Sequence, residues 1–239
     1  DDDLKEVFSN QFDVVFHFAG LKAARDSMID PLPFNNVNIN GTNNVIKHIV
    51  NKNIKHFIFS SSAAVYGDPL YLPMDEKHQL KPINYYGFTK LYVEELLRWH
   101  SQINSLNIAC LRYFNAAGYD VFGRMNKTEK KPNNFLPILM EVAIGKRHKV
   151  EVFGGDYKTN DGSCIRDYIH VNDLSQAHIN AMDYIVNKKQ NIIANLSTGI
   201  GCSVLEIIRT FERMYNVKVN YDIVGRKAGD PPSLYANAD

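Results

Sequence analysis

Short apolar runs alternate with longer stretches of helical periodicity along the first half of the chain. Residues 14–18, 55–60 and 108–112 are rich in apolar and β-branched side chains, as expected for strands buried on both faces of a sheet. Residues 41–50 and 86–99 have helical periodicity and lie between these runs. This order predicts a parallel sheet whose strands are joined by right-handed crossover helices.

The second half of the chain alternates less regularly. Residues 119–133 are polar and rich in lysine, which predicts a loop. Ser203 and Glu206 have the spacing of a capping box, which predicts a helix from there to about residue 215. The other predicted elements are helices at 135–144 and 173–186 and strands at 149–153, 192–196 and 218–224. The chain is therefore predicted to have an α/β fold with a doubly wound parallel sheet.

Composition and charge argue against several classes of protein. The chain has 239 residues, 45% of them apolar, which is enough for one large domain or two small ones. Its 27 Lys and Arg nearly balance its 26 Asp and Glu, and no block of like charge stands out. No apolar run approaches the roughly 18 residues that a membrane span needs. We therefore predict neither a nucleic-acid partner nor a membrane partner.

The cysteines and histidines indicate the compartment and the absence of a metal site. Cys110, Cys164 and Cys202 are odd in number and widely spaced, which is typical of reduced thiols in a cytoplasmic protein. The eight histidines do not cluster at ligand spacing, so no metal is predicted.

Tyr86 and Lys90 form a Y-x-x-x-K pattern on a predicted helix. Four residues advance a helix by slightly more than one turn, so the two side chains share a face about 6 Å apart. A phenol has a pKa near 10, and serving as a base near pH 7 requires a fall of roughly 3 in that pKa. A neighbouring ammonium stabilises the phenolate, so Lys90 is expected to supply part of this fall.

Ser60, Ser61 and Ser62 stand just after a predicted strand and before the Tyr86 helix. Ligands of open parallel sheets bind beyond the carboxyl ends of the strands, so these hydroxyls can face the same crevice as Tyr86 and Lys90. A serine run alone is more often a polar loop, and Y-x-x-x-K alone is common on amphipathic helices. Together, in this order, they indicate an active site.

Several motifs resemble those of a known family. S-S-S-A-A-V-Y-G at 60–67, N-x-Y-G-x-x-K at 84–90 and R-Y-F-N at 112–115 resemble the extended short-chain dehydrogenases. H-F-A-G-L-K at 17–22, N-N-F-L-P at 133–137, V-F-G at 152–154 and R-D-Y-I-H-V at 166–171 narrow the resemblance to the UDP-glucose 4-epimerase family. The likeness covers essentially the whole chain, and the motifs occur in the family's order.

The resemblance implies an NAD-dependent isomerase that interconverts UDP-glucose and UDP-galactose, with UDP-N-acetylhexosamines as a further candidate class. It implies that Ser62, Tyr86 and Lys90 are catalytic. Tyr86 would remove the proton of the sugar 4-hydroxyl while hydride passes to NAD. The 4-keto sugar would then turn over, and hydride would return to its opposite face. Lys90 would bind the nicotinamide ribose and lower the pKa of Tyr86, and a cationic nicotinamide would lower it further.

Binding roles follow from the same resemblance. The implied NAD-binding residues are Phe18, Ala19, Gly20, Lys22, Asn38, Ser60, Tyr86, Lys90 and Tyr113. The implied UDP-sugar-binding residues are Lys22, Ser62, Tyr86, Asn115, Asn134, Phe153, Arg166, Lys227, Asp230 and Leu234. In the second set, Phe153 would border the uracil, Arg166 would meet the diphosphate, and Asp230 would hold a ribose hydroxyl.

The chain departs from the family's pattern in three places. The Gly-rich turn that binds the cofactor phosphates is absent, so we expect the Rossmann-like sheet to be incomplete at its N-terminus and this chain by itself to bind NAD poorly. Lys227 replaces the second arginine of R-R-x-G-D, which should weaken diphosphate binding unless Arg226 compensates. Leu234 replaces a bulky Tyr or a small residue, and its intermediate size favours glucose and galactose over acetylated sugars.

The resemblance also implies a domain organisation. Residues 1–115 would form an NAD-binding domain lacking its first βα units, and residues 167–196 would return to it. Residues 116–166 and 197–239 would form a smaller substrate-binding region. The helix at 86–99 packs between subunits in this family, so we predict a homodimer.

Two other functions share part of this pattern. A nucleotide-sugar 4,6-dehydratase needs an extra acid/base pair, which that family places as Asp-Glu directly after the hydroxyl residue, whereas this chain has Ala63 and Ala64 there. A protein that kept the fold and lost activity is the other alternative. The missing Gly-rich turn argues weakly for it, and the intact Ser62, Tyr86 and Lys90 argue against it.

Overall fold

The computed structural model describes residues 2–125, 129, 132–227 and 229–237. They form two compact units. Of the described residues, the first contains those within 1–70, 76–113 and 175–196, and the second those within 71–75, 114–174 and 197–239. These are units of packing, and the assignment of NAD binding and substrate binding to separate domains stays a prediction.

The first unit contains a four-stranded parallel sheet in the order β1-β2-β3-β7. Its strands are β1 (Val14–His17), β2 (His56–Ser62), β3 (Asn107–Tyr113) and β7 (Ile192–Leu196). All four were predicted from their apolar runs, and the α/β fold class is confirmed. Strands β2 and β3 pair from His56 and Asn107 through to Ser62 and Tyr113, so their carboxyl ends lie side by side.

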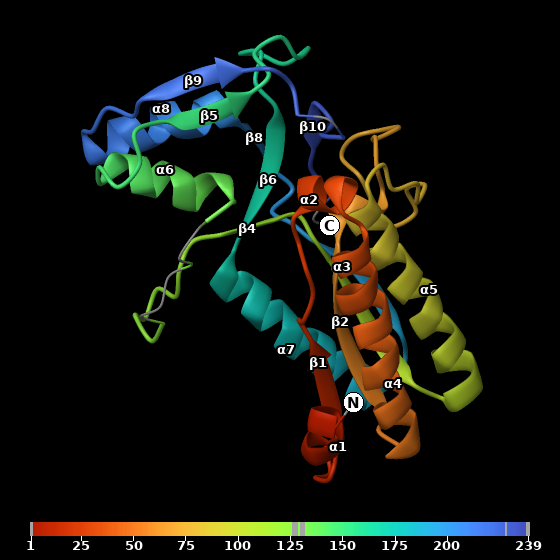
Figure 1. The fold of residues 1–239 in the computed structure, drawn as a ribbon. Helices are drawn as coiled ribbons and strands as arrows, with labels where there is room; N and C mark the ends of the chain where they lie inside the picture. Colours follow the sequence, from red (N-terminus) through yellow and green to blue (C-terminus); the bar gives the residue numbers. More distant parts are fainter. Residues whose placement is uncertain (1, 126–128, 130–131, 228, 238–239) are drawn as a thin grey trace. The chain divides into compact units, whose positions relative to one another are not determined.

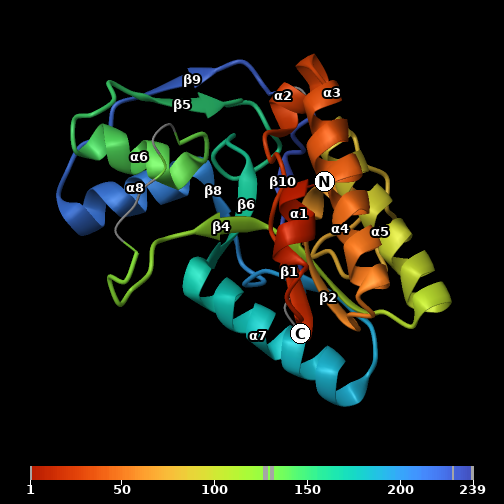
Figure 2. The same cartoon turned by 60° about the horizontal axis from the view of Figure 1, so that its bottom comes forward.

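Helices cover both faces of this sheet (Figures 1 and 2). On one face, Phe57, Phe59 and Ile108 join a core with side chains of α1 (Asp2–Val7), α4 (Gly41–Asn51) and α5 (Tyr85–Asn104). On the other face, Ile58 and Leu111 pack with side chains of α7 (Val171–Lys188). Because successive strand residues alternate between faces, the polar residues that follow these apolar ones are also divided between the two sides.

Helix α5 is longer than the predicted helix at 86–99. It begins earlier because Asn84 caps it, its side-chain oxygen accepting a hydrogen bond of 2.8 Å from the backbone N–H of Gly87. It ends only at Ser105, whose φ of 53° is left-handed. The short elements α2 (Ala24–Ile29), α3 (Leu32–Phe34) and the π-helical η1 (Asn35–Asn40) were not predicted, because none spans enough turns to show periodicity.

The second unit contains smaller sheets. Strand β6 (Ile165–His170) pairs with β4 (Asn115–Ala117) and β10 (Ser233–Leu234) in parallel and with β8 (Gly201–Ser203) antiparallel. Strands β5 (Val150–Phe153) and β9 (Tyr221–Val224) form a separate parallel pair. Helices α6 (Phe135–Ala143) and α8 (Val204–Tyr215) contribute to the core of this unit. The predicted capping box at Ser203 and Glu206 is present.

Three details of the second unit differ from the predictions or lie beyond them. The strand predicted at 218–224 begins only at Tyr221. The bounds of strand β6 were not predicted, because charged and polar residues interrupt its apolar ones. Of the loop predicted at 119–133, residues 126–128 and 130–131 lie outside the described part, and the remaining positions hold neither helix nor strand.

Candidate active site

Four hydroxyl side chains lie together at the carboxyl ends of β2 and β3, and we call them the hydroxyl cluster: Ser60, Ser62, Tyr86 and Tyr113. The Tyr113 hydroxyl lies 2.7 Å from Ser60 Oγ and forms a hydrogen bond with it. The Ser62 and Tyr86 side chains are also hydrogen bonded. Ser62 Oγ accepts a bond from the backbone N–H of Ala64 at 3.2 Å, which leaves the Ser62 O–H free to donate to the Tyr86 oxygen.

Lys90 brings a buried positive charge to this cluster. Its side chain is largely buried, and Nζ donates a hydrogen bond of 2.8 Å to the backbone carbonyl of Ser60. Nζ also lies 4.8 Å from the Phe59 ring centroid and 5.8 Å from that of Tyr86. Burial lowers the pKa of Lys90 to about 8, because the ammonium has lost most of its water. Lys90 is therefore still protonated near neutral pH, although its burial makes the charged form less favourable than in water.

The pKa of Tyr86 differs from the prediction. Burial raises this pKa above its ordinary value, and the hydrogen bond with Ser62 opposes the rise. Lys90 does not lower the pKa of Tyr86 enough to offset this rise. Its ammonium is directed at the Ser60 carbonyl, and the Tyr86 phenol is poorly hydrated. Tyr86 alone is thus a protonated phenol at neutral pH, and a further positive charge is needed to make it a base.

Close packing holds the start of α5 against neighbouring segments. A Cβ at Gly87 would lie 2.4 Å from the carbonyl oxygen of Ala64, so only glycine allows this approach. The backbone N–H of Tyr86 donates to the buried Ser27 hydroxyl at 3.0 Å. Both contacts fix the helical turn that carries Tyr86.

The loop after β1 leaves Phe18, Ala19 and Gly20 exposed. Asn38 holds this loop to α5: it accepts from Leu21 N at 2.8 Å and donates to Leu21 O and to Thr89 Oγ1, each at 3.0 Å. These three hydrogen bonds shape the loop, and the predicted cofactor contact of Asn38 stays a prediction.

Gly20 and Lys22 of the same loop were also predicted to meet the cofactor. A Cβ at Gly20 would lie 3.2 Å from Asn38 Oδ1 and 3.6 Å from Lys90 Nζ. The loop backbone thus comes close to the buried ammonium without a side chain between them. Lys22 is exposed on the same segment.

His178 contacts the cluster, and sequence patterns gave it no catalytic or binding role. Its Nε2 forms a hydrogen bond with the Tyr113 hydroxyl, and its ring lies 4.8 Å from that of the exposed Phe18. Burial raises the pKa of Tyr113 to about 12, so this phenol stays neutral beside Tyr86. The sequence contains one sign of such a role: His178 is a polar residue on the apolar face of α7, one turn before Ala181.

The second unit brings together several of the predicted substrate-binding residues. Arg166 donates from Nη2 to Asp230 Oδ1 at 2.5 Å, so these two are paired with each other. The Asn115 amide donates to the carbonyl oxygen of Asp167 at 2.8 Å. Asp167 itself is fully buried, and its carboxylate accepts from Thr198 N, Thr198 Oγ1 and Gly199 N. Sequence reasoning assigned Asp167 no role, although it directly follows the predicted residue Arg166 and its carbonyl holds the predicted residue Asn115.

The other predicted substrate-binding residues of this unit keep polar or apolar groups accessible. Lys227 Nζ lies 5.7 Å from the centroid of the half-buried Phe153 ring. Asn134 is exposed at the start of α6, and no hydrogen bond from its side chain caps that helix. Leu234 is the register partner of Arg166 in the β10–β6 pair.

Arg226, the residue that could compensate for Lys227, is engaged elsewhere. Its Nε donates to Asp156 Oδ1 at 2.8 Å, and its guanidinium lies 4.5 Å from the Tyr157 ring centroid. It would have to leave Asp156 to bind a phosphate. In this structure, Lys227 is therefore the better placed of the two cations for a ligand near Phe153.

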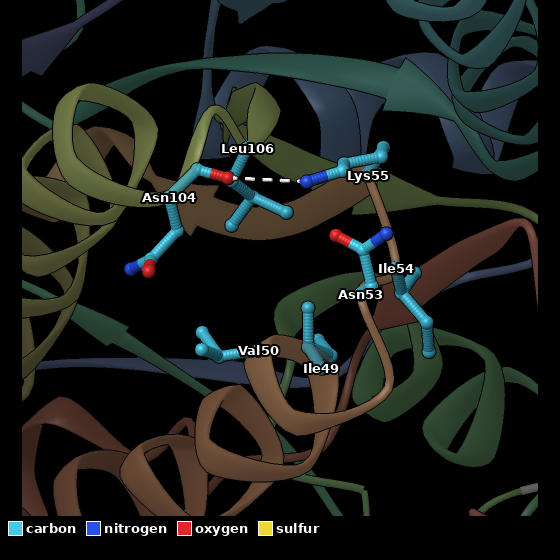
Figure 3. Close-up of a pocket in the computed structure, with 7 residues that line it drawn as sticks. All are labelled: Ile49, Val50, Asn53, Ile54, Lys55, Asn104 and Leu106. Carbon is cyan, nitrogen blue, oxygen red and sulfur yellow. Dashed lines mark hydrogen bonds between the residues drawn. The ribbon is translucent and has the colours of Figure 1, made fainter.

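A small pocket lies at the opposite ends of the strands (Figure 3). It is bounded by the end of α4, the start of β2 and the α5–β3 turn, and Lys55 Nζ donates to Asn104 O across it at 3.4 Å. Its volume of about 60 Å³ is far below the 300–1,000 Å³ typical of ligand sites. We assign it no part in the chemistry.

The described residues contain neither a metal-binding cluster nor a membrane-spanning helix. Within them, no group of three or more His, Cys, Asp or Glu side chains is placed to hold a metal ion. In the same part of the chain, no helix is both long and apolar enough to cross a bilayer.

Comparison with known proteins shows extensive likeness. Residues 1–197 match the model of the NAD dependent epimerase/dehydratase family. The chain is 42% identical to human UDP-glucose 4-epimerase over 238 residues, covering 98% of this chain and 68% of the human one. It is similar in structure to UDP-glucose 4-epimerase of Bifidobacterium longum in complex with NAD+ and UDP (TM-score 0.91, 39% identity, 98% and 71% of the chains covered). The UDP-Glc/GlcNAc 4-epimerase of Campylobacter jejuni matches with TM-score 0.82 and 38% identity, covering 100% and 73%.

Proposed function

The chain belongs to the NAD dependent epimerase/dehydratase family and, within it, to the UDP-glucose 4-epimerases, and from this we propose how its residues act. It is an NAD-dependent isomerase that interconverts UDP-glucose and UDP-galactose at sugar carbon 4. The observation that carries the proposal for the site is the pairing of Tyr86 with Ser62 and of Lys90 with the Ser60 carbonyl, at the adjoining ends of two parallel strands.

Tyr86 is the proposed base and acid. Its oxygen takes the proton of the sugar 4-hydroxyl and later gives it back, while the Ser62 hydroxyl orients the phenol and the sugar oxygen. Since burial raises the pKa of Tyr86, the phenolate needs nearby positive charge, and Lys90 is the cation that the protein provides. Bound NAD supplies the oxidation and reduction at carbon 4, and its cationic ring adds to the positive charge.

The residues present fit NAD. Gly20 leaves the loop backbone close to the Lys90 ammonium, in space that any side chain would fill. The ring of the exposed Phe18 lies 4.8 Å from that of His178 at an angle of 35°, and the two rings offer an apolar surface beside Tyr113. Within the part of the chain that the structure describes, Lys90 makes one hydrogen bond, to Ser60 O. An ammonium can make three, so it can also bind ribose hydroxyls.

Of the proposed UDP-sugar-binding residues, Lys22, Ser62 and Tyr86 belong to the first unit and the others to the second. Arg166 and Lys227 supply positive charge for the diphosphate, and Phe153 supplies a ring for the uracil. Asp230 would exchange its contact with Arg166 for a ribose hydroxyl. Asn115 and Asn134 offer amides to the phosphates or the sugar, and Leu234 borders the sugar.

An assay of the full-length protein tests this function directly. UDP-galactose incubated with the protein and NAD is expected to give UDP-glucose without net consumption of the cofactor. A 4-keto-6-deoxy sugar would instead indicate the dehydratase alternative. The structure places Ala63 and Ala64, which carry no acid or base, in the short helix η2 (Ala63–Val65) directly after Ser62.

Replacing Leu234 by serine is expected to change substrate preference. The smaller side chain leaves more room beside the sugar, so the ratio of kcat/KM for UDP-N-acetylglucosamine to that for UDP-glucose should rise by about 10-fold, the range that a few methylenes control. Ser233→Ala is the matched control, because Ser233 faces the other side of β10. An unchanged ratio for Leu234→Ser would show that another residue limits sugar size.

We also propose that the protein is a homodimer that associates through α5. Exposed apolar and aromatic side chains form one stripe along this helix: Phe88, Tyr92, Trp99 and Ile103. The last two are 62% and 72% exposed. A stripe of this kind on a soluble enzyme is typical of an association surface.

Trp99→Glu is expected to shift the protein from dimer to monomer, because a buried interfacial carboxylate without a partner is unfavourable. Analytical ultracentrifugation measures the change. Met214→Glu is the control, since Met214 is similarly exposed but lies on α8. A dimer that survives Trp99→Glu would place the interface elsewhere.

The cytoplasmic location predicted from the cysteines stays a prediction. The three cysteines are free thiols in the structure, and burial raises the pKa of Cys110 and Cys164, so neither is a reactive thiolate.

A further inference from the structure

A buried ion pair lies behind the hydroxyl cluster, on the opposite face of the sheet. The side chains of Glu94 and Arg112 are 0% and 1% exposed. Two parallel hydrogen bonds join them, from Arg112 Nη2 to Glu94 Oε2 at 2.6 Å and from Nε to Oε1 at 3.0 Å. None of the roles proposed above uses this pair.

Ser61 connects the ion pair to the strand that carries Ser60 and Ser62. Its hydroxyl donates to Glu94 Oε1 at 2.5 Å, and Ser61 is the register partner of Arg112. Because side chains alternate along a strand, Ser61 faces the ion pair while its two neighbours face the hydroxyl cluster. A displacement of Ser61 would therefore move both Ser60 and Ser62.

Three successive turns of α5 contact three successive residues of β2. Tyr86 is bonded to Ser62, Lys90 to the carbonyl of Ser60, and Glu94 to Ser61. The helix residues are spaced four apart, so they lie in one row. Glu94 also contacts a second strand, because it is bonded to Arg112 on β3. Among the described residues, the other two members of the row have no such bond to β3.

Arg112 extends the connection beyond α5. Its Nη1 donates to the Tyr66 hydroxyl at 2.9 Å, and that hydroxyl donates to Asn195 Oδ1 at 2.6 Å. Tyr66 directly follows η2, the short helix after Ser62, and Asn195 lies on β7. The ion pair thus ties together the segments on both sides of Ser62.

We propose that Glu94 and Arg112 are positioning residues for the epimerase reaction, holding α5 in the register on β2 that brings Tyr86 to Ser62 and Lys90 to the Ser60 carbonyl. This inference rests on the proposed function. A buried ion pair is weak evidence for a role in stability, because apolar residues of similar volume can often replace both members without loss. A variant that lacks the ion pair can therefore fold normally and still lose the positioning of Tyr86 and Lys90.

The test is the double variant Glu94→Met/Arg112→Met in the full-length protein. It is expected to melt at or above the wild-type temperature and to bind UDP as wild type, since the UDP residues are untouched. Its kcat should fall about 100-fold, the cost of a displacement of about 1 Å in a catalytic group. Loss of the Ser62 bond should also raise the pKa of Tyr86, moving the acid limb of the kcat profile to higher pH. The control is Glu95→Met/Arg98→Met, which removes an exposed ion pair from the same helix.

Ser61→Ala is the second variant and should fold in any case. It removes only the hydroxyl that joins Glu94 to β2, so we expect about a tenfold loss of kcat and an acid limb moved in the same direction. Wild-type kcat and pH profile in Ser61→Ala, or in a folded double variant, would overturn the inference.

A readout that needs no turnover separates this inference from the proposed function. In NMR titrations of carbon-13-labelled tyrosine, the pKa of Tyr86 is expected to rise in Ser61→Ala and in the double variant, but not in the Glu95/Arg98 control. An inactive wild type would refute the proposed function alone. An unchanged Tyr86 titration in both variants would refute the positioning role.

Discussion

Tyr86→Phe is expected to lower kcat by about 10²–10⁴-fold, the usual contribution of a general acid or base. Phenylalanine keeps the ring but removes the only oxygen that is hydrogen bonded to Ser62 from α5. The sugar 4-hydroxyl then has no partner to take its proton. KM for UDP-galactose and the Kd of NAD should change little, because the ring still fills its place. Steady-state kinetics and a binding titration of NAD measure the two quantities.

Tyr215→Phe serves as the matched control. Tyr215 is exposed at the end of α8, and its hydroxyl has no part in the proposed chemistry. Full activity in Tyr86→Phe would refute Tyr86 as the base. Equal losses in both variants would point to a general effect of tyrosine replacement.

Lys90→Met is expected to lower kcat/KM by at least about 100-fold, since it removes the cation that favours the phenolate and a donor to bound ribose. Unlike Tyr86→Phe, it should also weaken NAD binding. Lys52→Met, at an exposed lysine, is the control. Retained NAD affinity in Lys90→Met would show that Lys90 does not contact the cofactor.

The same variant should be more stable than wild type near neutral pH. Burial lowers the pKa of Lys90 to about 8 in the folded protein, from 10.5 in the unfolded chain. Below pH 8 both states carry the charge, and burying it lowers the free energy of unfolding. Between about pH 8 and 10.5 the unfolded state binds more protons, and wild-type stability from this group rises with pH. The advantage of Lys90→Met in urea denaturation should therefore shrink over that window. An advantage that is constant with pH would contradict a buried, titrating ammonium.

The sheet could be predicted from the sequence because its strands are buried on both faces. Val14 to His17 and the runs leading to Ser60 and Arg112 are apolar enough to stand out without periodicity. The bounds of strand β6 could not be predicted in this way, because two of its buried residues are charged. Arg166 is paired with Asp230, and Asp167 accepts a hydrogen bond from Thr198. Such pairings join residues far apart in the chain and leave no local pattern.

The site was partly predictable for a similar reason. The spacing of Tyr86 and Lys90 and the position of Ser62 after a strand are local signals, and the structure brings these residues together. The direction of the Tyr86 pKa was not predictable, because burial depends on the whole fold. Glu94 was likewise missed: one charged residue beside Val93 and Leu97 looks like an interruption of an apolar face until Arg112 is placed opposite it.

The most direct test of the account follows an isotope at carbon 4. UDP-galactose carrying deuterium at this carbon is converted by the full-length protein in ordinary water, and the UDP-glucose formed is examined by mass spectrometry and NMR. If the hydrogen of carbon 4 passes as hydride to bound NAD and returns to the opposite face, while Tyr86 moves only the proton of the 4-hydroxyl, deuterium stays at carbon 4 of the inverted product. Exchange of that deuterium for solvent hydrogen, or inversion at any other carbon, would contradict the account.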